Sequence, residues 1–207
     1  MNSAQTLGRL ASSLRFACSS FWKMEASFKG VTLGNNVVLV GRPMISVASD
    51  STLFLSDGVR VVSAERSNPL GCSQPSVLRT MAPKAKLVLG PAVGISATVI
   101  CAGREITIGE NTIIGSGAMI LDNDFHERRP DGTWDDVFDR NARPIHIGRS
   151  VFIGARAIIL KGVEIGDQAV IGAGAVVTNN VPPSTFFAGN PARQIRSTRN
   201  TAVSARD

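Results

Sequence analysis

The sequence holds two histidines, His126 and His146, which are its best candidates for acid–base chemistry. An imidazole titrates near neutral pH, so it can remove the proton from an attacking hydroxyl group. His126 ends the stretch DNDFH, in which Asp122 and Asp124 lie within reach of the same position. Either carboxylate could orient the imidazole or hold hydroxyl groups of a substrate, although acidic residues also cap turns. We therefore take His126 as the candidate general base.

Composition and charge exclude several other kinds of site. The three cysteines, Cys18, Cys72 and Cys101, form no CxxC pair, so we expect no disulfide framework and no metal site, and we expect a cytoplasmic protein. The net charge of +6 favours an anionic partner. Nucleic acid is not expected, because no basic stretch is interleaved with aromatic residues. No run approaches the roughly 18 apolar residues of a transmembrane helix.

A six-residue repeat in the sequence predicts the strands and turns that would position these side chains. In the C-terminal half, aliphatic residues recur every six positions, and glycine follows four of them: Ile147, Ile153, Ile159, Ile165, Ile171 and Val177. Earlier, less regular copies contain Leu33, Leu39, Ile45, Leu55, Val61, Leu89, Ile95, Cys101, Ile108, Ile114 and Ile120. A period of six fits neither an amphipathic helix nor a simple meander. It fits a short strand followed by a tight turn, with the aliphatic residue pointing inward.

Stacked units of this kind predict an all-β fold, a parallel β-helix whose coils lie about 4.8 Å apart. With three hexads per coil, residues 31–62, 87–126 and 145–181 supply roughly six coils. Cys101 then occupies an inward position as a small hydrophobic residue. His146 directly precedes the inward Ile147 and should point outward as a surface residue.

Two stretches interrupt the repeat. Residues 63–86 contain three prolines and no hexad, and residues 127–144 form a polar loop that begins directly after His126. A loop this long inside a compact domain is usually functional. We expect a short, helical N-terminal segment over residues 1–30, the β-helix domain over 31–186, and a C-terminal segment near the coenzyme over 187–207.

Residues 105–126 and 145–196, which end in AGNPARQIR, resemble the hexapeptide-repeat acyltransferases. The segment from SNPLG to DNDFH is most similar to the sugar O-acetyltransferases of polysaccharide biosynthesis. The resemblance implies a left-handed β-helix and a homotrimer in which coenzyme and acceptor meet between neighbouring chains. It also implies that His126 is the catalytic base, assisted by Asp124. Asp122, Asn123 and Trp134 are then the candidate acceptor-binding residues.

The same resemblance implies that the acyl donor is acetyl-CoA. The positions that line the coenzyme in galactoside acetyltransferase correspond here to Ala155, Ala173, Thr178, Arg193 and Arg196, and Lys161 is a further basic candidate. Asn179 stands where relatives often carry lysine, and Ala155 where they often carry serine, which leaves only a backbone N–H at position 155. The alternatives are a solvated basic surface for the arginines and repeat packing for the small residues.

The predicted function is an acetyl-CoA-dependent O-acetyltransferase that acts on a carbohydrate hydroxyl, in surface polysaccharide or exopolysaccharide biosynthesis. An N-acetyltransferase of an amino sugar or a xenobiotic acetyltransferase remains an alternative. A zinc carbonic anhydrase on this fold needs three histidines around the metal, and the chain has two. A non-catalytic β-helix scaffold would require neither the loop nor His126.

Overall fold

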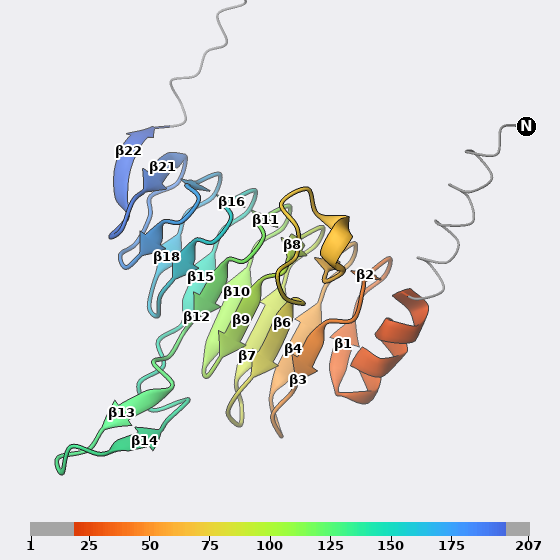
Figure 1. Ribbon diagram of the computed structural model, residues 1–207, viewed down its shortest axis with the longest axis horizontal. Helices are drawn as coiled ribbons and strands as arrows, with labels where there is room; N and C mark the ends of the chain where they lie inside the picture. The colour runs from red at the N-terminus through yellow and green to blue at the C-terminus, as the bar shows by residue number, and fades with distance from the viewer. Residues whose placement is uncertain (1–18, 198–207) are drawn as a thin grey trace, which may run out of the picture.

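The structure is a computed structural model that describes residues 19–197, and its strands wind into a three-sided parallel β-helix (Figure 1). Sheet A contains β1 (Val31–Leu33), β4 (Thr52–Leu55), β7 (Lys86–Leu89), β10 (Glu105–Ile108), β15 (Ile145–Ile147) and β18 (Glu164–Ile165). Sheet B contains β2 (Val38–Val40), β5 (Arg60–Val62), β8 (Gly94–Ser96), β11 (Ile113–Ile114), β16 (Phe152–Ile153), β19 (Val170–Ile171), β21 (Thr185–Ala188) and β22 (Arg193–Ser197). Sheet C contains β3 (Met44–Ser46), β6 (Val77–Thr80), β9 (Val99–Ala102), β12 (Met119–Leu121), β17 (Ile158–Ile159) and β20 (Val176–Val177).

One strand from each sheet makes one coil, and sheets A and C have six strands each, as the hexad count predicted. All neighbouring strands of the three sheets are parallel except β22, which runs antiparallel to β21. Predicted inward aliphatic residues fill the core: Leu55, Leu89, Ile120, Ile153 and Ile171 are fully buried. Burial of these stacked side chains is the main stabilising contribution, at roughly 1.5–3 kcal/mol per side chain.

The predicted inward position of Cys101 is wrong by one residue. Ile100 points into the core and pairs in register with Ile120, whereas Cys101 lies outside the main core cluster. The turn that precedes β9 is one residue shorter than the repeat, so Ile95 and Ile100 are five positions apart. Cys101 is nevertheless buried, and burial raises the pKa of its thiol to about 11.

The first interruption is shorter than predicted. Residues 77–80 form β6, which pairs with β3 and β9, so only residues 63–76 leave the β-helix. We call residues 63–76 the first excursion, and it contains the short 3-10 helix η1 (Glu65–Ser67). The hexad pattern did not predict β6, because the register of the repeat restarts after the excursion, with Leu78 pointing inward. The second interruption holds a β-hairpin, β13 (His126–Arg128) and β14 (Trp134–Asp136), that projects from the body in Figure 1.

Both ends of the β-helix are covered by other segments. Residues 19–28 are helical, and Ala26 and Trp22 pack onto the core, while residues 1–18 of the predicted N-terminal segment lie outside the described residues. At the other end, β21 joins sheet B, so the predicted boundary at residue 186 falls inside a strand. No helix in the described part of the chain is long and apolar enough to cross a membrane.

Candidate active site

Apart from Arg193 and Arg196, which lie on β22, the predicted site residues lie on two of the three corners of the β-helix. We define the histidine corner as the turns from sheet C to sheet A, residues 122–144, 160–163 and 178–180. We define the small-residue corner as the turns from sheet B to sheet C, residues 115–118, 154–157 and 172–175. Because successive coils stack, the turns of one corner form a continuous line along the helix axis.

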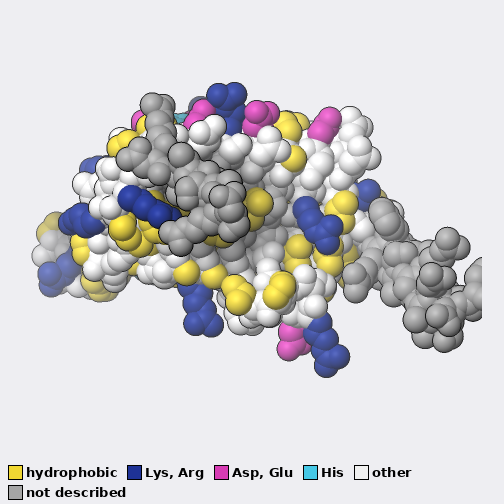
Figure 2. All heavy atoms as spheres, turned by 90° about the horizontal axis from the view of Figure 1, so that it is seen from above, with side chains coloured by type: hydrophobic (Ala, Val, Ile, Leu, Met, Phe, Trp, Pro, Cys, Tyr) yellow, Lys and Arg dark blue, Asp and Glu magenta, His cyan; other side chains and the backbone are white. Residues whose placement is uncertain are grey.

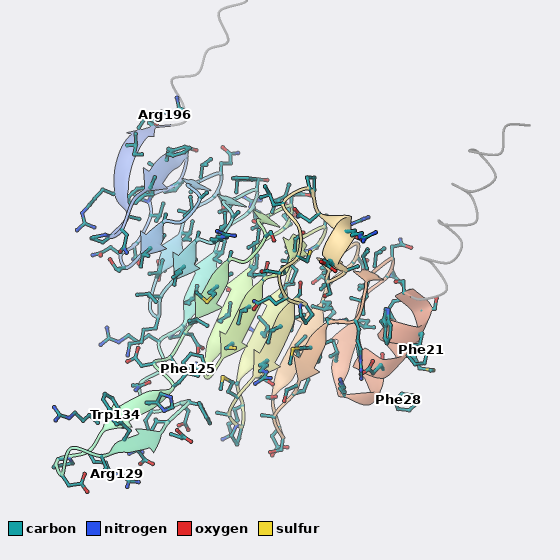
Figure 3. The ribbon with its side chains drawn as sticks, viewed as in Figure 1. Phe21, Phe28, Phe125, Arg129, Trp134 and Arg196 are labelled. Atoms are coloured by element: carbon teal, nitrogen blue, oxygen red, sulfur yellow. The ribbon has the colours of Figure 1, made fainter. Side chains whose placement is uncertain are left out.

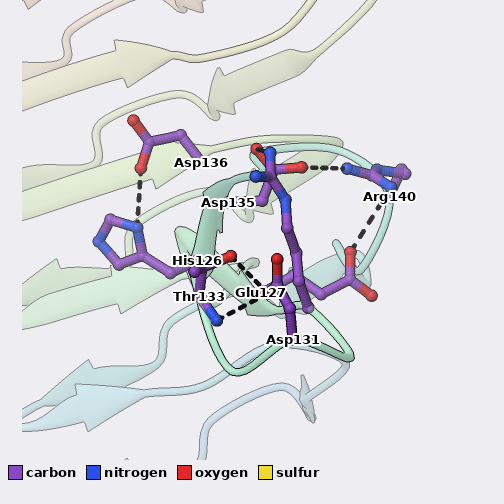
Figure 4. A network of polar contacts seen from close by, with 8 residues as sticks. His126, Glu127, Asp131, Thr133, Asp135, Asp136 and Arg140 are labelled. Atoms are coloured by element: carbon purple, nitrogen blue, oxygen red, sulfur yellow. Dashed lines mark hydrogen bonds and ion pairs between the residues drawn. The ribbon is translucent and has the colours of Figure 1, made fainter.

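His126 begins strand β13 on the histidine corner, and its imidazole is held by Asp136 (Figure 4). The two residues are directly opposite in the hairpin, and Nδ1 of His126 lies 2.9 Å from Oδ1 of Asp136. A carboxylate only accepts hydrogen bonds, so Nδ1 carries the proton and Nε2 is left to accept one. Among the described residues Nε2 has no partner, and the side chain is 58% exposed. The imidazole is therefore oriented, open to solvent, and able to act as a base.

Asp136 was not identified from the sequence. Ten residues separate it from His126, and only the turn of the hairpin brings the two together. The prediction that Asp124 orients the imidazole is not supported, because Asp124 forms an ion pair with Lys161 across the same corner. That ion pair also occupies Lys161, which had been assigned to the coenzyme. Asp124 and Lys161 therefore tie the start of the hairpin to the next coil.

Asp122 and Asn123 are buried beneath the hairpin. The carboxylate of Asp122 accepts hydrogen bonds from the backbone N–H groups of residues 103, 104 and 105 at 2.7–2.9 Å. Asn123 donates from Nδ2 to Asp122 at 2.9 Å and accepts from the N–H of Phe125 at 3.0 Å. Their exposed fractions are 0% and 4%, so neither side chain is open to an acceptor. The structure corrects the predicted acceptor contacts to a positioning role.

The hairpin leaves the β-helix through a strained residue. Phe125 has a φ of +63°, a region that bulky residues rarely adopt. Its carbonyl accepts a hydrogen bond from the N–H of Val137 at 2.8 Å, and its ring packs edge-on against Phe138 at a centroid distance of 6.5 Å. These contacts hold the backbone directly before His126. Strained backbone of this kind is concentrated at functional sites.

Further out, charged pairs stiffen the hairpin. Arg140 lies between Asp135 and Glu127, at 3.2 Å and 3.8 Å, and Arg129 also contacts Asp135 at 2.9 Å (Figure 4). Trp134 is 66% exposed and lies on the projecting part of the hairpin, beyond Phe125 (Figure 3). An exposed indole is free to stack on a sugar face.

The small-residue corner carries the predicted coenzyme positions Ala155 and Ala173. They line a hollow of about 430 Å³ together with Leu70, Gly71, Ser73, Ser116, Gly117, Arg156 and Gly174. A Cβ at Gly115 would lie 2.6 Å from the backbone N of Ala155, and a Cβ at Gly154 would lie 2.4 Å from that of Ala173. The repeat glycines are therefore required by the close stacking of one turn on the next.

This stacking leaves backbone groups available to a ligand. The N–H groups of Ala155 and Ala173 form no hydrogen bond within residues 19–197. Unpaired N–H groups in line along a corner can donate to a ligand's carbonyl and phosphate oxygens. The assignment of Ala155 and Ala173 to the coenzyme stays a prediction.

The remaining coenzyme candidates lie on the histidine corner and on β22. Thr178 lies on the histidine corner and donates from its hydroxyl to Asn179 at 2.7 Å. Arg193 and Arg196 lie on β22, the last strand of sheet B, which pairs antiparallel with β21. Both are exposed, and the guanidinium of Arg196 lies 5.4 Å from the ring centroid of Phe186. Within one chain, the candidate base and most of the candidate coenzyme positions therefore lie on different parts of the β-helix.

His146 points outward from sheet A, as predicted, and its Nδ1 lies 2.8 Å from the hydroxyl of Thr107. Arg149 lies on the third corner, between sheets A and B, where it pairs with Asp167 at 3.0 Å. Neither residue belongs to the two corners described above. Within the described residues no cluster of three or more His, Cys, Asp and Glu side chains could hold a metal ion.

Comparison with known proteins identifies the repeat. The family model described as the hexapeptide repeat of succinyl-transferase matches residues 144–179. Galactoside O-acetyltransferase of Escherichia coli (strain K12) is 39% identical over 94 residues, which are 44% of this chain and 43% of that protein. This chain thus spans less than half the length of that relative.

Solved structures share the architecture over most of the chain. AntD, an N-acyltransferase from Bacillus cereus crystallised with dTDP and 3-hydroxybutyryl-CoA, has a TM-score of 0.61 at 19% identity, covering 84% of this chain and 87% of that one. A hexapeptide-repeat-containing acetyltransferase from Vibrio cholerae has a TM-score of 0.55 at 21% identity, covering 96% and 94%. These structures confirm the predicted left-handed parallel β-helix. The chain is thus similar to hexapeptide-repeat acetyltransferases in its repeat, over residues 144–179, and in its fold.

Proposed function

We propose that this protein transfers an acyl group, with acetyl as the expected group, from coenzyme A to a hydroxyl group of a carbohydrate. The observation that carries the proposal is the imidazole of His126, oriented by Asp136 on an insertion of the hexapeptide β-helix. The relative named galactoside O-acetyltransferase supports an acetyl donor and a sugar acceptor. AntD, crystallised with an acyl-CoA, shares the fold.

In the proposed mechanism, Nε2 of His126 accepts the proton of the acceptor hydroxyl as its oxygen attacks the thioester carbonyl. The tetrahedral intermediate then collapses, the C–S bond breaks, and the imidazolium returns the proton to the departing thiolate of coenzyme A. Asp136 keeps Nε2 as the accepting nitrogen and stabilises the imidazolium through its charge. The products are the acyl ester and free coenzyme A.

The coenzyme would lie along the small-residue corner. Ala155 and Ala173 offer unpaired N–H groups there, and the flanking glycines leave room for an extended chain to approach the backbone. Arg193 and Arg196 lie on β22 at the C-terminal end of sheet B and would hold the phosphates of the coenzyme. This arrangement supports the resemblance-based assignment of these four residues.

We propose that the protein works as a homotrimer whose active sites lie between chains. The candidate base and the small-residue corner occupy different corners of one chain, so the histidine corner of one chain must meet the small-residue corner of its neighbour. Cyclic symmetry repeats this contact three times in a closed ring. The expected trimer is checked by sedimentation, and a well-folded monomer with full activity would contradict the arrangement.

Mixing two inactive variants tests the shared site directly. One variant carries His126→Ala, and the other carries Ala173→Trp, which fills the small-residue corner. After unfolding and refolding a 1:1 mixture, about a quarter of the interfaces should combine an intact histidine corner with an intact small-residue corner. Activity should therefore return to about a quarter of the wild-type level. If the mixture stays as inactive as its components, each site lies within one chain.

The reaction itself is tested by thiol release from acetyl-CoA with a panel of oligosaccharides, nucleotide sugars and amino sugars. Release that depends on hydroxyl-bearing sugars supports O-acylation, whereas release that requires an amino group would show the N-acyltransferase alternative. Release with no member of the panel would contradict the proposed carbohydrate acceptor.

We further propose a role in surface polysaccharide biosynthesis within the cytoplasm. Free thiols at Cys72 and Cys101 suit a reducing compartment. Deletion of the gene should remove acetyl esters from the surface polysaccharide of the source organism. An unchanged ester content would contradict this role.

A further inference from the structure

A second hollow, of about 810 Å³, lies on the outer face of sheet B. Sheet B runs along the upper side of Figure 1, so Figure 2 views this face, where hydrophobic and basic side chains are prominent. The hollow crosses four coils, from β5 to β16, which is about 14 Å at about 4.8 Å per strand. Its lining is uncharged except for one residue, Arg60.

The hollow exists because a glycine interrupts a row of outward side chains. Arg60, Gly94, Ile113 and Phe152 are in register on neighbouring strands of sheet B. Gly94 has no side chain, and a Cβ built there would meet nothing within 4 Å. Ile113 and Phe152 are 54% and 48% exposed, so they border the gap without filling it. The missing side chain leaves room for a ligand between Arg60 and the two apolar residues.

The first excursion forms the wall of this hollow. Its residues 67–70 line the hollow, and Leu70 is 74% exposed. The hydroxyl of Ser116 donates a hydrogen bond to the carbonyl of Gly71 at 2.7 Å, which fixes the wall to the fourth coil. Leu70, Ser116 and Ala155 line both this hollow and the one at the small-residue corner. A ligand in the sheet B hollow would therefore lie beside the proposed coenzyme.

Arg60 is the charged group of the hollow, and its charge is not compensated. Its guanidinium forms no ion pair and no hydrogen bond with any described residue, whereas Arg42 and Arg149 are each paired with a carboxylate. No aspartate or glutamate lines the hollow. A guanidinium is a rigid fork of donors that matches a carboxylate or a phosphate. The charge of this hollow therefore favours an anionic ligand.

We infer that the sheet B hollow binds the acceptor, and that the acceptor is an acidic carbohydrate whose carboxylate or phosphate pairs with Arg60. The inference rests on the proposed function, because it takes the neighbouring corner as the place of the acyl donor. The apolar walls, Leu70, Ile113 and Phe152, would pack against the C–H faces of the sugar rings. The shared lining at Ala155 then places the acceptor's far end beside the thioester. Arg60 is thus a specificity-determining residue for the acceptor.

Equilibrium binding with matched sugars tests the inference without relying on catalysis. The probes are an oligosaccharide containing glucuronic acid, its carboxyl-reduced neutral counterpart, and the neutral sugar bearing a phosphate, each titrated by nuclear magnetic resonance with the wild-type protein. We expect the wild type to bind at least one acidic probe ten or more times as tightly as the neutral one. The preferred acidic probe distinguishes a carboxylate from a phosphate. Equal binding of all three, or binding of none, would overturn the inference.

Variants of the hollow complete the test. Arg60→Ala should remove the preference for the acidic probe and leave neutral binding unchanged, and Arg60→Glu should reverse the preference. Arg66→Ala is the matched control, because it removes the same charge from the first excursion outside the lining of the hollow. Gly94→Leu fills the hollow at a position with open space and should abolish binding of every probe, with coenzyme A affinity retained.

The two proposals fail in different ways. If Arg60→Ala binds the acidic probe as tightly as the wild type, the inference is wrong, whatever the thiol-release assay shows. If acidic probes bind through Arg60 but no sugar promotes thiol release, the proposed acyl transfer fails and the binding site stands.

Discussion

The histidine corner and the small-residue corner are built from the same coils but present opposite kinds of chemistry. At the small-residue corner, a Cβ on Gly115 or Gly154 would collide with the backbone of the next turn, so the repeat excludes larger groups there. The residues stacked on these glycines, Ala155 and Ala173, offer a ligand only their backbone N–H groups. At the histidine corner, residues 122–144 leave the repeat, and His126 is presented on a hairpin with charged neighbours. Side-chain chemistry in this fold therefore comes from an insertion, and backbone chemistry from the repeat itself.

The largest effect is expected at the insertion. His126→Ala should lower kcat by about 10²–10⁴, because the general base is lost and no other histidine lies on either corner. The trimer and the affinity for acetyl-CoA should be unchanged. Steady-state kinetics beside circular dichroism measures this, with His146→Ala as the control that keeps normal turnover. A His126 variant with more than about a tenth of wild-type turnover would show that another group is the base.

The second largest effect is expected where the hairpin joins the β-helix, and there the substitution should act mainly on the stability of the fold. Asp122→Ala leaves three backbone N–H groups without their acceptor, and each buried unsatisfied donor costs about 1–3 kcal/mol. We expect a loss of at least about 3 kcal/mol in the free energy of unfolding, measured by urea denaturation. Because the hairpin loses its anchor, kcat should fall as well. A variant of normal stability and low kcat would instead indicate direct contact with the acceptor.

Paired amide substitutions at the histidine corner compare the two candidate orienting carboxylates. Asp136→Asn should lower kcat roughly tenfold, because an amide no longer fixes Nδ1 as the protonated nitrogen. The effect is expected to be modest because the side chain of Asp136 is 76% exposed. Asp124→Asn should change kcat much less, since Asp124 pairs with Lys161. The opposite ranking in steady-state kinetics would restore the assignment made from the sequence.

The sequence predicted the fold well because the core repeats. Each hexad contains an inward aliphatic residue followed by a tight turn. The sequence singled out His126, which lies where the repeat gives way to the loop, and the role of His126 as the base stays a prediction. It could not predict Asp136, since pairing across a hairpin depends on where the turn lies within residues 127–144. Nor did it show that Asp122 is buried, because an acidic residue at a corner is ordinarily exposed. Most of the unpredicted contacts lie in irregular segments, because their structure depends on tertiary contacts and not on a sequence period.

At the C-terminal end of sheet B, the double variant Arg193→Ala, Arg196→Ala should raise the KM for acetyl-CoA about tenfold and leave the KM for the acceptor nearly unchanged. Each charge-assisted contact is worth about 1.5–3 kcal/mol when buried, and less here because both residues are exposed. Initial-rate kinetics with each substrate varied in turn measures the two constants. Equal changes in both constants would indicate disturbed packing of β21 and β22 rather than lost phosphate contacts.

The smallest effect is expected at the third corner, between sheets A and B, which serves as the control for the two corners compared above. Asp167 accepts hydrogen bonds from the backbone N–H and the guanidinium of Arg149, and these lower the pKa of its carboxyl below the ordinary 3.8. A lowered pKa means that the stabilisation is complete above about pH 3.8 and is lost as the pH falls through the folded-state value. Asp167→Asn should therefore lower the Tm slightly at pH 7, and its difference from the wild type should shrink below pH 3.8. Turnover should not change, because the group holds one turn to the next and touches neither proposed ligand. A loss of kcat in this variant at neutral pH, with the Tm nearly intact, would show that chemistry in this β-helix is not confined to two corners.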